Sequence, residues 1–489
     1  MPGLTSPVQA WMQVMHAAGY DVGALADAQT RLSFVGADPI LNSPFALGTA
    51  GAAALAALGT AVSDLWQWRG GRPLDVRVEL AHAAAALRST TYLRIDGQPP
   101  PSPWDPIAGF YATADGRHIQ LHTNFPHHRD GTLALLRVGA DREQVARAIL
   151  RREAFELEDA MAAAGLCATA ARTRAEWLAH PQAQALAALP LLEIQRVADA
   201  DPEPLSTRPR KPLSGVRMLD LTRVLAGPTA GRCFVEHGAE VLAICSPDLP
   251  NLPFVMQDTN HGKYSAHLRL RDAADLARLR QLVSGCDVFL QAYRPGALQG
   301  LGLGVADLVR LRPGIVCVDL SAYGHVGPWQ ARRGYDTLVQ SACGIAAEQG
   351  RAVAPMRGET LAAPRHLPCS ALDYVTGFLA AFGAVVALTR RSREGGSWHV
   401  RVSLAQTARW LDALGRVRRS AGLLKPAQML PELDAEAWMQ ESDSAAGPLR
   451  YLKPALQLLS PFPAIAQAIA PGWDFPAVPA GTHAAQWQR

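Results

Sequence analysis

The chain has 489 residues, of which 49% are hydrophobic and 18% are charged, so it is long enough for two or three domains with a sizeable buried core. Lys and Arg total 47 against 43 Asp and Glu, which gives a formal net charge of +4, and no Lys/Arg run resembles a polyanion-binding tail. We therefore expect no nucleic-acid partner, although a local basic site for a phosphorylated small molecule fits this balance.

The seven cysteines are scattered and form no CxxC pair, which disfavours a disulfide scaffold and a zinc site. The first residues lack the basic start and apolar run of a signal peptide, so we expect a cytoplasmic protein with reduced thiols. Residues 45–62 carry no charge but are mostly Ala, with Gly and Thr. This composition indicates a closely packed buried helix, and we expect no membrane span.

An internal repeat relates two distant parts of the chain. When the sequence is shifted by 324 positions against itself, residues 55–81 share twelve identities with residues 379–405. Leu55-Ala56-Ala57 aligns with Leu379-Ala380-Ala381, and Val76-Arg77-Val78 aligns with Val400-Arg401-Val402. The common register covers an apolar helix, a Gly-containing turn and an alternating strand. We interpret it as an internal duplication, with chance similarity between Ala-rich segments as the alternative.

The segments that follow each copy differ. Residues 109–122 predict a hairpin with an Asp-Gly turn between alternating strands, and helical patterns follow it. A Pro-rich charged stretch at 201–214 predicts a linker. From Gly215, strand candidates at 216–221, 240–245, 286–291 and 314–320 alternate with helical patterns, which predicts a parallel sheet. Residues 412–489 are Pro-rich, and we expect an irregular tail without a comparable hairpin.

A series of short motifs follows the first strand of the predicted sheet. Gly215 to Pro228 runs from a hydrophobic strand through a small-residue turn into a helical pattern, a place where α/β sheets bind ligands. It is followed by Asn260-His261-Gly262-Lys263, Tyr293-Arg294-Pro295-Gly296, Leu301-Gly302-Leu303-Gly304 and Gly334-Tyr335-Asp336. The order and spacing of the series resemble the family III CoA-transferases, a group that also holds α-methylacyl-CoA racemase. The resemblance covers roughly residues 45–410.

The resemblance implies an α/β fold with a parallel Rossmann-like sheet domain and a smaller α+β domain, in a rearranged or fused order. Residues 1–200 would hold a connecting segment and the small domain, and residues 215–411 the CoA-binding sheet and a second connecting segment. Because family members form interlocked dimers, either a homodimer or a pseudo-dimeric monomer is implied.

Several residues match positions at which the family contacts CoA. They are Leu225, Ala226, Asn260, Lys263, Tyr293, Arg294, Tyr323 and Gly324. Backbone amides at such turns cradle phosphates, and a Lys or Arg supplies charge. Two arginines found in relatives are replaced, one by Cys245-Ser246 and one within Leu298-Gln299-Gly300.

The position expected for the family nucleophile holds no Asp. Family transferases use an Asp carboxylate that attacks the acyl-CoA, forms a mixed anhydride and then carries CoA as a thioester. The expected position falls near residues 351–355, where the nearest carboxylates are Glu348 and Glu359. Asp373 matches the racemase Asp, whereas Tyr335 stands where the racemase has a His. Asp373 is either a helix cap or a catalytic residue. Asp336 is a further catalytic candidate, with organisation of its turn as the alternative.

Three functions are compatible with these residues. The first is a CoA-transferase that moves CoA between carboxylic acids, with acyl-CoA as substrate and no tightly bound cofactor. The alternatives are a racemase-like enzyme and a CoA-binding subunit without activity. A dinucleotide-binding Rossmann protein fits less well, because the first turn is Leu225-Ala226-Gly227-Pro228 and not GxGxxG. His122, His127 and His128 lack the spacing of a metal site, and we expect them to form a polar lip on the acyl pocket.

Overall fold

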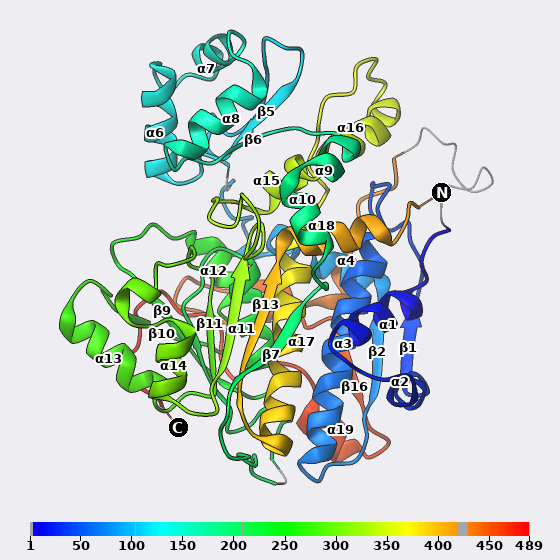
Figure 1. Ribbon diagram of the computed structural model, residues 1–489. Coiled ribbons are helices and arrows are strands. Elements are labelled where there is room, and N and C mark those ends of the chain that lie inside the picture. The colour runs from blue at the N-terminus through cyan, green and yellow to red at the C-terminus, as the bar shows by residue number, and fades with distance from the viewer. Residues whose placement is uncertain (1–2, 103, 208, 418–428, 489) are drawn as a thin grey trace.

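The computed structural model describes residues 3–102, 104–207, 209–417 and 429–488 (Figure 1). Within these residues the main sheet has seven strands in the order β10-β9-β8-β11-β12-β13-β7. All neighbouring strands are parallel except β13 and β7, which are antiparallel. The strands are β7 (Glu193–Ala198), β8 (Arg217–Asp220), β9 (Glu240–Cys245), β10 (Tyr264–His267), β11 (Val288–Gln291), β12 (Val316–Ser321) and β13 (Ser397–Ser403). The four predicted strands and the parallel sheet are therefore confirmed.

Helices cover both faces of this sheet. On one face, α11 (Ala226–Glu236) and α17 (Ala371–Glu394) pack against each other and share a core with Met218 and Val288. On the other face, α13 (Ala273–Val283) and α14 (Val305–Leu311) bury apolar residues against Leu219 and Phe289. The chain runs outward from β8 to β10 and then returns to β11 on the other side of β8. The carboxyl ends of β8 and β11 therefore form a topological switch point, where open α/β sheets bind ligands.

The two segments related by the sequence repeat fold in the same way. α3 (Leu47–Trp68), β2 (Asp75–Glu79) and α4 (Leu80–Ala86) follow one another as do α17, β13 and α18 (Leu404–Ala413). β2 lies between the parallel strand β1 (Leu32–Val35) and the antiparallel strand β16 (Leu456–Leu459), just as β13 lies between β12 and β7. α3 and α17 pack side by side (Figure 1). Both helices are buried, as expected for α3.

A glycine in each helix allows the strand of the same segment to come close. A Cβ atom on Gly59 would lie 2.9 Å from Val76 Cγ1 and 2.7 Å from a methyl of Leu456. A Cβ on Gly383 would lie 2.7 Å from Val400 Cγ1 and 3.1 Å from a methyl of Leu192. Distances this short exclude any larger side chain unless the packing moves.

α17 is the one helix in the described ranges that is long and apolar enough to cross a membrane. Of its most apolar window, 94% is buried inside the protein, as expected for a core helix.

The small domain is the upper lobe in Figure 1. β4 (Gly109–Ala112) and β5 (His118–Leu121) form the predicted antiparallel hairpin, and β6 (Ala168–Ala170) pairs with β5. α6 (Pro126–Leu136), α7 (Arg142–Ile149) and α8 (Ala154–Ala163) pack on this sheet around Ile119, Leu121 and Met161. The domain therefore has a core of its own.

The expectation of an irregular tail at 412–489 is wrong for a large part of it. β14 (Met439–Ser442) and β15 (Leu449–Leu452) form an antiparallel hairpin that pairs with β3 (Arg94–Ile95). β16 pairs with β2, and α19 (Pro463–Ile469) follows it. These strands are short and their partners lie far away in the sequence, so the local pattern does not reveal them.

The remaining helices connect these parts. They are α1 (Pro7–Ala17), α2 (Val22–Gln29), α5 (Ser89–Tyr92), α9 (Arg174–Ala179), α10 (Pro181–Ala187), α12 (Pro253–Thr259), α15 (Asp336–Ala342) and α16 (Ile345–Val353), with short 3₁₀ turns at Gln299–Leu301, Ala354–Arg357 and Glu436–Trp438. All seven cysteines lie within the described ranges, and each is free and buried.

Candidate active site

A buried ion pair holds the turn between β8 and α11 in place. Lys263 has a fully buried side chain, and its Nζ donates to Asp220 Oδ2 at 2.9 Å and to the Pro228 carbonyl at 2.7 Å. Asp220 also accepts from the amide and hydroxyl of Thr222. The prediction that Lys263 contacts CoA is therefore not supported by its position. Its ammonium compensates a buried carboxylate and does not reach solvent.

Arg223 and Val224 follow this buried network. Val224 has φ of 70°, a conformation that is strained for a β-branched residue and that occurs most often at functional turns. Arg223 bonds the Pro250 carbonyl, and its guanidinium lies 5.6 Å from the ring centre of Phe125 in the small domain. The turn thus links the sheet edge to the small domain.

Three of the predicted CoA contacts lie near this turn. Leu225 and Ala226 begin α11 and are buried, and Asn260 lies at the end of α12. Asn260 lines a narrow crevice together with Arg223, Cys245 and Phe125. Within the part of the chain that the structure describes, no side chain caps the N-terminus of α11. Its first amides therefore favour an anion at this place.

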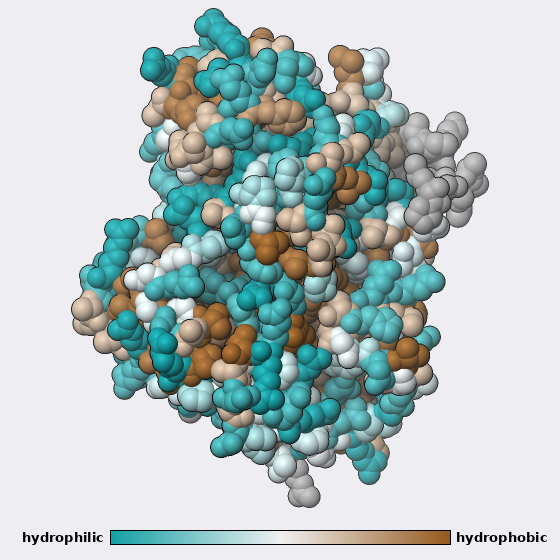
Figure 2. Space-filling model, in the orientation of Figure 1, coloured by the Kyte–Doolittle hydropathy of each residue, from teal (hydrophilic) through white to brown (hydrophobic). Residues whose placement is uncertain are grey.

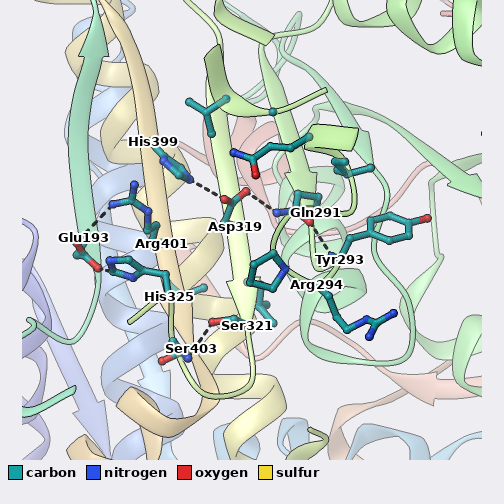
Figure 3. A pocket seen from close by; sticks show the side chains of 18 of the residues that line it. Glu193, Gln291, Tyr293, Arg294, Asp319, Ser321, His325, His399, Arg401 and Ser403 are labelled. Carbon is teal, nitrogen blue, oxygen red and sulfur yellow. Dashed lines mark hydrogen bonds and ion pairs between the residues drawn. The ribbon is translucent and has the colours of Figure 1, made fainter. Parts of the chain in front are cut away.

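Three other predicted contacts line a larger cavity of about 450 Å³ (Figure 3). Tyr293 and Arg294 follow β11, and Gly324 follows β12. Tyr323, next to Gly324, is buried. The structure therefore divides the predicted contacts between the crevice after β8 and β9 and the cavity beside β11 and β12.

The floor of the cavity carries polar side chains that the sequence did not single out. His399 bonds Asp319 at 2.8 Å, and Gln291 bonds the other oxygen of Asp319 at 2.8 Å. His325 lies 3.3 Å from Glu193. The walls are apolar and come from α14 and residues 186–191. Figure 2 shows the apolar side chains gathered on this face between α14 and β7.

Two catalytic candidates, Asp336 and Asp373, lie together. Asp336 begins α15 and is buried, and its Oδ2 accepts a hydrogen bond of 2.9 Å from the backbone amide of Asp373. Its other oxygen accepts from Gln340. Asp373 is half-buried in the first turn of α17. The structure thus joins a helix-capping carboxylate to a second carboxylate on the capped helix.

Both carboxyl groups hold their protons more tightly than usual. Burial raises the pKa of Asp336 to about 6, although its hydrogen bonds act in the opposite direction. Burial, and then the neighbouring Asp336 carboxylate, raise the pKa of Asp373 well above its ordinary value. Closely spaced carboxylates titrate as a pair, so both pKa shifts belong to the Asp336–Asp373 pair, called the dyad below.

Side chains of the small domain pack on Tyr335, the residue next to Asp336. The ring of His122 stacks on Tyr335 with centroids 3.9 Å apart, and Phe125 lies 6.0 Å from the same ring. Tyr335 directly precedes Asp336, and the charge of Asp373 acts on its phenol. Burial lowers the pKa of His122 to about 4, so this imidazole is neutral near pH 7. The contact with Tyr335 is therefore aromatic and uncharged at His122.

The three histidines lie near one another but do not form a metal site. The rings of His127 and His128 are 4.0 Å apart, and His128 lies 3.5 Å from Cys167 Sγ. Among the described residues, no group of three or more His, Cys, Asp or Glu side chains has the arrangement to hold a metal ion.

The other two carboxylates considered for the nucleophile are held by arginines. Glu348 bonds Arg416 through both oxygens at 2.6 and 2.8 Å. Glu359 bonds Arg365 through both oxygens at 2.5 and 2.7 Å. Such paired carboxylates are poor nucleophiles, because attack would break the bidentate contacts.

Part of this chain is similar in sequence to known CoA-transferases. The profile of CoA-transferase family III matches residues 213–416, which include the main sheet from β8 to β13, Asp336 and Asp373. The acetyl-coenzyme A transferase nodX of Hypoxylon pulicicidum is 37% identical over 207 residues, which are 42% of this chain and 34% of that protein. The succinyl-CoA:glutarate CoA-transferase of Mus musculus is 35% identical over 198 residues, 38% of this chain and 43% of that protein.

Among solved structures, Rv3272 of Mycobacterium tuberculosis in its orthorhombic form is similar at 31% identity, with a TM-score of 0.38 over 42% of this chain and 59% of that chain. The chain spans about a third to a half of the length of the two curated relatives described above.

Proposed function

We propose that this chain, whose residues 213–416 match the profile of CoA-transferase family III, is a member of that family and moves CoA from an acyl-CoA to a second carboxylic acid. One observation carries the proposal. Within the matched segment, a half-buried Asp373 lies in the first turn of α17 beside a second carboxylate. Its charge acts on Tyr335, whose ring stacks on His122 of the small domain. A carboxylate in a partly dry pocket is more nucleophilic than one in water.

The proposed reaction on Asp373 requires only the acyl-CoA and the acceptor carboxylic acid. The Asp373 carboxylate attacks the thioester carbonyl, the C–S bond breaks, and CoA thiolate leaves an acyl-aspartyl anhydride. The thiolate then attacks the aspartyl carbonyl, releases the first carboxylate and forms an aspartyl-CoA thioester. The acceptor carboxylate then attacks the aspartyl-CoA thioester, which releases CoA thiolate and forms a second mixed anhydride. The thiolate attacks the acceptor's carbonyl in this anhydride, which gives the new acyl-CoA and restores the Asp373 carboxylate. The two steps replace one difficult displacement by two easier ones.

CoA would bind across the switch point of the sheet. Its phosphates suit the start of α11 at Leu225 and Ala226, where no side chain of the described residues caps the helix. Its remaining polar groups suit Asn260, Arg294 and Gly324. Tyr293 links the crevice to the cavity. It lines the cavity, and Arg223, which lines the crevice, acts electrostatically on its phenol. With no arginine at Cys245 or Gly300, Arg294 and Arg401 line the cavity and Arg223 lines the crevice.

Racemisation is less well supported. Such a reaction needs a second base beside Asp373, and Tyr335 takes that position. Burial raises the pKa of the Tyr335 phenol above its ordinary value, so it is a poor base at neutral pH. The relatives described above are named as transferases and not as racemases.

The two similar helix-strand-helix units of this chain would form a two-fold arrangement within a single polypeptide. The repeated units α3-β2-α4 and α17-β13-α18 each receive an antiparallel edge strand from the other part of the chain: β16 follows the second unit and pairs with β2, while β7 follows the first and pairs with β13. This exchange supports an internal duplication and a pseudo-dimeric monomer, with a homodimer as the alternative.

The proposal is tested by trapping the intermediate. The full chain is mixed with acetyl-CoA or succinyl-CoA, treated with hydroxylamine and mapped by peptide mass spectrometry. A hydroxamate on Asp373 that is absent from Asp373→Asn supports the transferase. CoA binding without any trapped carboxylate would contradict it. A hydroxamate on Glu348 or Glu359 would keep the reaction but move the nucleophile.

A further inference from the structure

The first turns of α3 and α17 are capped by the same device. Asp38 lies in the segment before α3, and its oxygens accept from the amide of Gly48 at 3.1 Å and of Thr49 at 2.8 Å. Asp336 lies before α17 and accepts from the amide of Asp373 at 2.9 Å. The shift that aligns the two copies places Thr49 on Asp373, so each Asp binds the same position of its helix.

The two capped positions differ in one respect that concerns chemistry. The first copy carries a hydroxyl at Thr49, and the second carries a carboxylate at Asp373. An Asp cap requires no particular side chain at the residue whose amide it binds. A carboxylate directly beside a buried carboxylate costs free energy, so its presence at Asp373 is not explained by helix capping.

We infer that Asp336 is a positioning residue, which holds the backbone of Asp373 in the first turn of α17 and keeps a second carboxylate beside its side chain, whereas Asp38 keeps only the capping role. The inference rests on the proposed function, in which Asp373 is the nucleophile. A neighbouring negative charge makes the Asp373 carboxylate more basic and more nucleophilic once it is ionised. Asp336 therefore sets the pH range over which Asp373 reacts.

The groups around the dyad are largely neutral or weakly acidic. The Asp373 charge acts on Tyr335, the residue before α15, and His122 stacks on Tyr335 from the end of β5. The Asp336 charge acts on Cys369 in the loop before α17. The other nearby charges affect the neighbours of the two carboxylates. Arg223 and Arg333 act on Tyr335, and Arg88 and Asp38 act on Cys369. The Asp336 carboxylate is therefore the charge in direct contact with the backbone of Asp373.

The test compares the two caps in the full-length protein. The rate of hydroxylamine-trapped modification at Asp373 is measured with succinyl-CoA from about pH 4.5 to 8, in the wild type and in Asp336→Asn, Asp336→Glu and Asp38→Asn. Asp336→Asn removes the charge, so its profile should move to lower pH by about one unit. Asp336→Glu keeps the charge, and its profile should return toward that of the wild type.

Asp38→Asn is the matched control. Each Asn loses one acceptor oxygen at a helix start, so both variants should lose similar thermal stability, and Asp38→Asn should leave the pH profile unchanged. An unshifted profile for Asp336→Asn, or an equal shift for Asp38→Asn, would overturn the inference.

Two further outcomes keep the test decisive. If Asp336→Asn does not fold, the wild-type profile alone is informative, because a coupled dyad gives two ionisation steps and a lone carboxylate gives one. A single step would overturn the inference. No modification of Asp373 in the wild type at any pH would instead overturn the proposed function on which the inference rests.

Discussion

Trp68 at the end of α3 donates a hydrogen bond of 2.9 Å from its Nε1 to Ser392 Oγ near the end of α17, and the two residues are 324 positions apart. This separation equals the shift that aligns the two copies in the sequence. Trp68 and Ser392 thus occupy matching positions in the shifted alignment and are in direct contact with each other. Such a contact between equivalent positions occurs where two related units meet at a two-fold axis.

The equivalent glycines should respond equally to substitution. Gly383→Ala places a methyl group 2.7 Å from Val400, and Gly59→Ala places one 2.9 Å from Val76. We expect each variant to lose about 1–3 kcal/mol of the free energy of unfolding, measured by urea denaturation. Gly300→Ala is the control, because no described atom lies within 4 Å of its added Cβ. A loss at only one of the two glycines would show that the copies are packed differently.

Local patterns in the sequence predicted the elements whose partners are near or whose periodicity is strong. The strands around Leu219 and Val318, the hairpin at Tyr111 and the helices around Gly59 and Gly383 were predictable for this reason. The helix-strand repeat was visible because both copies kept the same register.

Contacts between distant residues were not predictable in the same way. His399 and Asp319 form a hydrogen bond across neighbouring strands although they are 80 residues apart. The sequence from Asn260 to Lys263 likewise does not reveal that Lys263 is buried against Asp220. The pairing of Asp336 with Asp373 also depends on how α15 meets α17. Both aspartates could be selected as candidates from the sequence, but their contact could not.

The buried pair of Lys263 and Asp220 should be essential for stability. Lys263→Met leaves the Asp220 carboxylate buried without its cation, so we expect a loss of about 3–5 kcal/mol in the free energy of unfolding. Arg269 pairs with Asp248 on the surface, where both side chains are more than half exposed. Arg269→Ala should therefore cost less than about 1 kcal/mol. Equal losses in the two variants would contradict the buried role of Lys263.

Glu348 should be dispensable for the reaction. Glu348→Gln removes the ion pair with Arg416, which still bonds Asp412. We expect trapping at Asp373 to stay within about twofold of the wild type, and the unfolding free energy to fall by about 1 kcal/mol. Trapping is measured with acetyl-CoA at a fixed pH. Loss of trapping in a variant that keeps its thermal midpoint would return Glu348 to the list of nucleophiles.

Acid should destabilise the protein through His237. This side chain is fully buried in the main core, neither ring nitrogen has a hydrogen-bond partner among the described residues, and burial lowers its pKa from 6.5 to about 3. Between these two pH values the unfolded chain binds a proton that the folded chain does not. The stability associated with neutral His237 is therefore complete above about pH 6.5 and is lost as the pH falls toward 3.

His237→Leu removes this proton uptake and keeps a side chain of similar size in the core. At about pH 5 the variant should be more resistant to unfolding than the wild type by about 2 kcal/mol, relative to their difference at pH 7. Urea denaturation at both pH values measures the change, and the exposed His16→Gln serves as the control. If His237→Leu loses stability with acid as steeply as the wild type, the proton must bind elsewhere, and the neutral state of His237 in the folded protein would be contradicted.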